Sequence, residues 1–118
     1  MAVTDDDEGR AVRVVLADVH ATLGTGYESI VRENARRLRE FIDDPVRYFE
    51  RVVEDTQQDF HDRYIDTDWP KCPRHRGRHP LWLGEGGWWC QNDGLLIAAV
   101  GHLGSPVDPE STQDRSRT

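Results

Sequence analysis

The chain has 118 residues, of which 36% are hydrophobic and 31% are charged, and it carries a net charge of −7 at pH 7. This length suits one ordinary domain and excludes two sizeable hydrophobic cores. The acidic balance opposes attraction of the whole surface to nucleic acid or to an anionic membrane, so a contact with either would have to be local.

The sequence contains no membrane-spanning or signal-peptide pattern. No apolar run approaches the roughly 18 residues that a bilayer requires, and the acidic residues 5–8 are the opposite of a signal peptide's basic start. We therefore expect a cytoplasmic protein with no membrane partner. Its two cysteines should be reduced there, which favours metal binding or simple burial over a disulfide.

Composition divides the chain into a central domain and two polar ends. Residues 1–9 and 104–118 offer little that could pack, and we expect both to be disordered. Residues 10–103 are predicted to form a single α+β domain with a helical part at 10–66 and a small sheet at 69–103. The expected architecture is two or three antiparallel helices packed against a three-stranded antiparallel meander.

The first half of the helical part shows two helix patterns. Apolar residues at 11–23 fit a helical period better than a strand period, and Gly24 follows where a C-terminal cap belongs. Thr25 and Glu28 then have the spacing of a capping box, in which each side chain binds a backbone amide at a helix start. A second helix is expected to begin there.

A further helix is predicted at about residues 46–64. Asp44 suits the N-cap, and Pro45 suits the first helical position, where its missing N–H costs nothing. Amphipathic helices joined by a short connection pack antiparallel, because each covers the apolar face of the other. We therefore expect four side chains to be buried and to face one another: Phe41, Phe49, Val53 and Phe60.

After Trp69 and Pro70 the composition changes to Gly, Pro, Trp, Cys and His, and the helical periodicity stops. Residues 81–83, 88–90 and 95–100 are typical of three short strands. Asp93-Gly94 is a strong hairpin signal, because glycine supplies the positive φ that the turn needs.

Cys72 and His75 form a Cys-x-x-His knuckle, whose spacing lets a thiolate and an imidazole turn toward one metal ion. Fourteen residues separate His75 from Cys90, which lies beyond a Gly-rich segment that is predicted to form a hairpin. Such a hairpin would bring the second cysteine beside the knuckle. The pattern predicts a metal site that serves structure rather than catalysis.

The fourth ligand has two main candidates. His79 lies four residues after His75 and immediately before Pro80, whereas Asp93 occupies the place where a Cys-x-x-Cys knuckle would have its second cysteine. The position of Asp93 before a glycine is equally explained by turn chemistry. We favour His79 over Asp93, and His61 and His102 are more remote alternatives.

The same residues also allow a metal-free interpretation, in which Cys72 and Cys90 are small buried side chains. Metal binding is favoured because strands this short, separated by several glycines, have little core of their own. A structural zinc ion would supply folding free energy directly.

The C-terminal third resembles zinc-ribbon proteins, and more closely a group of uncharacterised small proteins of high-GC bacteria. The shared elements run in the order CPxH, HPL, W-x-C and DG, which correspond here to residues 72–75, 79–81, 88–90 and 93–94. The resemblance covers roughly residues 69–103 and implies a zinc-ribbon-like meander. It implies no activity and does not extend to the helices.

A basic and aromatic patch beside the predicted metal site could contact a partner. Positive charge near an exposed Trp suits single-stranded nucleic acid, although tryptophans in a small sheet are more often core and the arginines can pair with the acidic residues of 43–68. The candidate partner-binding residues are Lys71, Arg74, Arg76, Arg78 and Trp82.

These patterns favour a non-enzymatic binding or accessory protein with a structural, zinc-holding ribbon and a protein partner, which could be a second copy of the chain. One alternative is a module that contacts nucleic acid, for which affinity would fall steeply with salt. The other is a small zinc-dependent enzyme, for which turnover would depend on metal. No His-Glu-x-x-His helix or phosphate-binding loop supports the enzyme.

Overall fold

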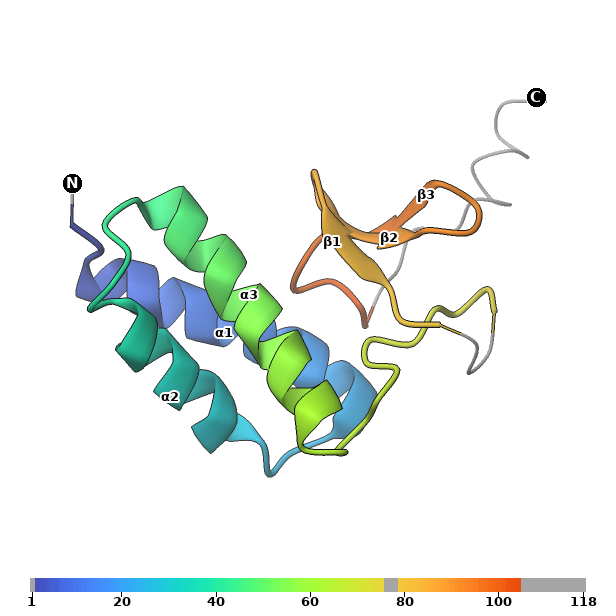
Figure 1. Ribbon diagram of the computed structural model, residues 1–118, viewed down its shortest axis with the longest axis horizontal. Coiled ribbons are helices and arrows are strands. Elements are labelled where there is room, and N and C mark those ends of the chain that lie inside the picture. The colour runs from blue at the N-terminus through green and yellow to red at the C-terminus, as the bar shows by residue number, and fades with distance from the viewer. Residues whose placement is uncertain (1, 76–78, 105–118) are drawn as a thin grey trace.

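The computed structural model describes residues 2–75 and 79–104, which form three helices followed by a three-stranded sheet. The helices are α1 (Asp5–Leu23), α2 (Glu28–Leu38) and α3 (Pro45–Asp62), and the strands are β1 (Trp82–Gly84), β2 (Gly87–Cys90) and β3 (Leu95–Ala98). The helices reverse direction at each connection and lie beside the sheet (Figure 1). The sheet is an antiparallel meander in the order β1-β2-β3, so the predicted α+β fold is confirmed.

The N-terminus is more ordered than predicted, because α1 begins at Asp5 rather than near residue 10. The Thr4 hydroxyl accepts a hydrogen bond from the Asp7 backbone N–H at 3.1 Å, and the Asp7 carboxylate accepts one from the Thr4 N–H at 2.9 Å. The acidic residues in the first turn also stabilise the helix, because their negative charge lies at the positive end of the helix dipole. The prediction of disorder for residues 1–9 was wrong over this part, because these acids form a helix start. The predicted disorder of residues 105–118 lies outside the described residues.

The connection between α1 and α2 corrects a second detail. Gly24 ends α1 with a φ of 82°, as expected, but α2 starts only at Glu28, and its N-cap is Tyr27, without a side-chain hydrogen bond. The Glu28 carboxylate accepts a hydrogen bond from the Gly26 backbone N–H at 2.8 Å. Glu28 therefore stabilises the turn before the helix, and the capping box predicted from Thr25 does not form.

The N-terminus of α3 agrees with the sequence, since Asp44 is the N-cap and Pro45 the first helical residue. Its buried face includes two polar side chains, Tyr48 and Thr56. The Tyr48 hydroxyl donates to the Ala35 carbonyl of α2 at 2.7 Å, and the Thr56 hydroxyl donates to a carbonyl of its own helix. Because these polar atoms are satisfied inside the protein, both residues can be buried without an unpaired group.

Only part of the predicted helix interface is correct. Val53 and Phe60 are fully buried, and Phe49 is half-buried, but Phe41 is 73% exposed. Phe41 lies in the turn after α2, beyond the end of that helix, so the helical period no longer directs its side chain toward the core. The expectation that all four side chains face one another was therefore wrong for Phe41.

A buried carboxylate on α1 joins the sheet to the helices. Asp18 is fully buried, and its Oδ2 accepts hydrogen bonds from the Trp88 indole N–H at 2.8 Å and the Gly101 backbone N–H at 2.7 Å. Its Oδ1 accepts a third, from the Leu103 backbone N–H at 2.9 Å. Asp18 thus binds both the central strand β2 and the segment that follows β3.

Aromatic rings continue this contact toward α3. Trp69 packs edge-on against Phe60, with ring centroids 4.9 Å apart, and against Trp88 at 5.7 Å. The Gln57 amide of α3 donates to the carbonyls of Trp69 and Leu81 at 3.2 and 3.0 Å. The helices and the sheet therefore share one core.

Within residues 2–75 and 79–104, none of the helices has both the length and the apolar character needed to cross a membrane.

We predict that Asp18→Asn lowers the free energy of unfolding by about 2 to 3 kcal/mol, because an amide cannot replace a carboxylate that accepts three charge-assisted hydrogen bonds. Urea unfolding followed by tryptophan fluorescence measures the loss. The matched control is Asp6→Asn, an exposed position of the same helix, which should change stability by less than about 1 kcal/mol. Equal effects of the two substitutions would show that Asp18 does not hold the sheet.

Candidate metal centre

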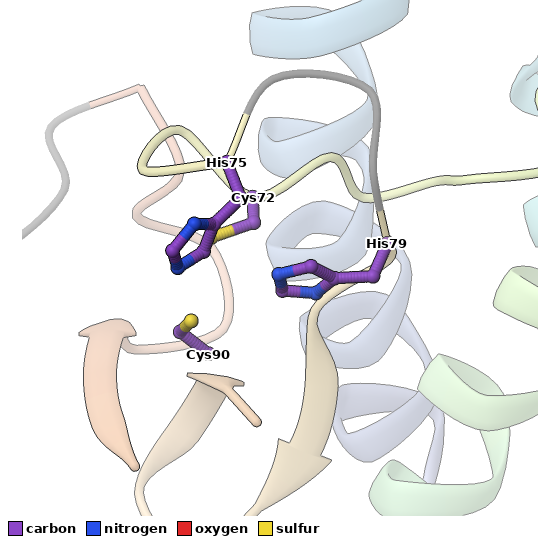
Figure 2. Close-up of side chains that lie close together, drawn as sticks. All are labelled: Cys72, His75, His79 and Cys90. Atoms are coloured by element: carbon purple, nitrogen blue, oxygen red, sulfur yellow. The ribbon is translucent and has the colours of Figure 1, made fainter. Parts of the chain in front are cut away.

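Two cysteines and two histidines converge at one end of the sheet. One donor atom from each of Cys72, His75, His79 and Cys90 can be chosen so that all four lie within 4.8 Å of one another (Figure 2). Ligands of one zinc ion, bound at about 2.0 to 2.3 Å, must lie this close together. The cluster could hold a metal ion, and the prediction that the two cysteines approach each other is confirmed.

The approach of Cys72 to His79 follows from local backbone pairing. The Cys72 N–H donates to the His79 carbonyl at 3.5 Å, and the Leu81 N–H donates to the Pro70 carbonyl at 2.7 Å. Lys71 and Pro80 form an antiparallel bridge between these two bonds. The segment that carries the knuckle therefore runs beside the segment that leads into β1.

The register of the sheet brings Cys90 to the same place. Trp89 of β2 pairs with Trp82, the first residue of β1, so Cys90 lies level with the chain that arrives from His79. On its other side Cys90 pairs with Leu95 of β3, and its carbonyl accepts a hydrogen bond from the Gly94 N–H at 2.8 Å. The predicted hairpin thus delivers the second sulfur to the knuckle.

The Cys-x-x-His turn is closed by a backbone hydrogen bond, in which the His75 N–H donates to the Cys72 carbonyl at 3.3 Å. Burial raises the pKa of the Cys72 thiol, the neighbouring Cys90 raises it further, and the backbone N–H groups of Arg74 and His75 oppose the increase. A bound cation would reverse the balance, because a coordinating thiol is deprotonated by the metal.

The cluster contains one unsatisfied polar atom that distinguishes a metal site from ordinary packing. Cys72 and Cys90 are buried, as either interpretation expects. The Nε2 atom of His79, however, is buried without a hydrogen-bond partner, the only such side-chain nitrogen or oxygen within the described part of the chain. Buried polar groups normally have a partner. A metal ion among the four donors would supply one.

The remaining histidines and Asp93 lie outside this donor set among the described residues. Asp93 instead accepts a hydrogen bond from the Arg74 guanidinium at 2.6 Å, and its Oδ2 lies 3.1 Å from the Nε2 of His75. The pKa of this carboxyl group is lowered, mainly by the hydrogen bond from Arg74 and to a smaller extent by His75. The Nε2 atom of His61 lies 2.7 Å from the Trp69 carbonyl oxygen, and His102 is exposed. The geometry is that expected for His79 as the fourth donor.

The proposed basic patch is only partly available for a partner. The Lys71 ammonium lies 3.6 Å from an Asp66 carboxylate oxygen, and Arg74 is bound to Asp93. Arg76 and Arg78 lie outside the described residues. Trp82 is 54% exposed on β1, whereas Trp88 is fully buried and provides no stacking surface.

Asp18, which connects the sheet and its candidate metal site to the helices, was not predicted from the sequence. A signal was present, because Ala11, Val15, Asp18 and Thr22 recur every three to four residues along one face of α1. An acidic residue within an otherwise apolar stripe indicates a buried carboxylate with specific donors. The donors themselves are 70 to 85 residues away and could not be identified from spacing.

Comparison with known proteins gives no relative for this chain: no family model matches it, and neither a curated protein nor a solved structure does so.

We predict that Cys90→Ser lowers the melting temperature and that a strong chelator lowers the melting temperature of the unsubstituted protein to about the same value. The reason is that both treatments remove the same metal, whose binding free energy contributes directly to folding. Differential scanning calorimetry with and without chelator measures the two effects, and the Cys90→Ser protein should not respond to chelator.

Ala98→Ser is the matched control, since it adds a hydroxyl at a buried position of the same sheet that contributes no donor. It should be destabilised by about 1 to 3 kcal/mol and should keep the chelator response. If chelator leaves the unsubstituted protein unchanged while Cys90→Ser still melts lower, Cys90 is only a core residue.

Proposed function

We propose that the protein is a non-enzymatic binding or accessory protein whose ribbon is stabilised by a structural zinc ion. The observation that carries the proposal is the convergence of the donors of Cys72, His75, His79 and Cys90 within 4.8 Å. Two thiolates and two imidazoles are a standard donor set for tetrahedral zinc, and thiolates select against magnesium and calcium. The proposal assumes a reducing compartment such as the cytoplasm, where thiols remain free to bind metal.

The completeness of the donor set argues against catalysis at this centre. A catalytic zinc ion usually has three protein ligands and an open position for water or substrate. Here four side chains are close enough to fill a tetrahedral shell. The small metalloenzyme is therefore the weaker candidate.

A protein partner suits the exposed surface better than nucleic acid does. The basic side chains of Lys71 and Arg74 are already paired with carboxylates, which reduces their capacity to neutralise phosphates. Trp82 remains 54% exposed on the edge strand β1, and tryptophan is among the residues that contribute most to protein interfaces. A second copy of the chain is one form that such a partner could take.

The zinc proposal is tested by the metal content of protein that is purified without added metal and without a metal-affinity tag. Elemental analysis by mass spectrometry should find about one zinc per chain, as a closed four-ligand site requires. The Cys90→Ser protein, purified in parallel, should contain much less. A folded protein that carries no zinc and takes up none when it is supplied would contradict the proposal.

A further inference from the structure

The two ring nitrogens of His79 have different surroundings. Nδ1 lies 3.1 Å from the Pro80 carbonyl oxygen, which can only accept a hydrogen bond. The proton of a neutral imidazole is therefore held on Nδ1, and Nε2 carries the lone pair. Because Nε2 is the buried atom without a partner, it is the nitrogen of His79 that is prepared to bind a metal.

His75 shows the opposite arrangement. Its Nε2 lies 3.1 Å from a carboxylate oxygen of Asp93, which can only accept a hydrogen bond, so the ring proton is held on Nε2. The lone pair of a neutral ring is then on Nδ1. Histidines that bind metals commonly donate the other ring N–H to a carboxylate or a backbone carbonyl, which fixes the tautomer and the ring orientation. Asp93 would fix the tautomer and orientation of the His75 ring, and the Pro80 carbonyl would do the same for the His79 ring.

We propose that the metal is bound by His75 through Nδ1 and by His79 through Nε2, together with both cysteine sulfurs, and that Asp93 is a positioning residue rather than a ligand. This inference rests on the proposed function, because it assigns the atoms and the supporting carboxylate of the same site. The Arg74 guanidinium, 2.6 Å from the same Asp93 oxygen, holds the carboxylate in place from the solvent side.

The first test measures zinc affinity of the full chain by competition with a chromophoric chelator. Asp93→Ala should weaken zinc binding by about 10-fold to 100-fold, the usual effect of removing the partner of a metal-bound histidine. Asp93→Asn should lose less, because its amide oxygen can still accept a hydrogen bond from the Nε2–H of His75. The control Arg74→Gln keeps Asp93 and should also lose less than Asp93→Ala.

A second readout separates positioning from direct binding. Cobalt(II) added to metal-free protein should give the absorption spectrum of two thiolates and two imidazoles, and Asp93→Ala should leave that spectrum unchanged. In protein loaded with NMR-active cadmium, the metal should couple to Nδ1 of His75 and to Nε2 of His79. These results would support the assignment.

Three results would overturn it: a cobalt spectrum that changes when Asp93 is replaced, zinc affinity that Asp93→Ala does not alter, or cadmium coupling to Nε2 of His75. Each of them can be obtained while the unsubstituted protein binds one zinc ion, so the proposed function would stand. If the unsubstituted protein binds neither zinc nor cobalt, both the proposed function and this inference are wrong.

Discussion

The buried carboxylate of Asp18 fixes how the small sheet sits on the helices. It accepts one hydrogen bond from the indole of Trp88 on β2 and two from backbone groups after β3, at Gly101 and Leu103. A buried charge is costly unless its hydrogen bonds are satisfied, so few other placements of these donors could stabilise it. The constraint therefore selects one docking of the sheet, whereas apolar contact alone would tolerate several.

Trp88 and Cys90 lie two residues apart on β2, so the short central strand connects the helices with the candidate metal centre. At one end its indole binds Asp18, and at the other its sulfur joins the Cys72 knuckle. A sheet of three- and four-residue strands has too little area to be stable by itself. The aromatic contact through Trp69 and a bound metal would both stabilise it, and a stable β1 edge would hold Trp82 at the surface.

The features that follow from local chemistry were predictable from the sequence. The α3 cap at Asp44 and Pro45 and the order of three strands depend on neighbouring residues, and the Cys-x-x-His spacing indicated the cluster that could hold a metal ion. Long-range features were not predictable in the same way. Tyr48 can enter the core because its hydroxyl donates a hydrogen bond to a carbonyl of another helix. Asp93 lies in the turn between β2 and β3, and its contact with His75 joins two loops that are far apart in the sequence. Composition also misled at the N-terminus, where an acidic run that suggested disorder forms the first turn of α1.

The central claim is that two sulfurs and two imidazole nitrogens surround one zinc ion at the end of the sheet. X-ray absorption spectroscopy at the zinc edge tests it most directly, on full-length protein purified without added metal. The account predicts two sulfur neighbours at about 2.3 Å and two nitrogen neighbours at about 2.0 to 2.1 Å. A shell with a single sulfur, or with a water or carboxylate oxygen in place of an imidazole nitrogen, would contradict it.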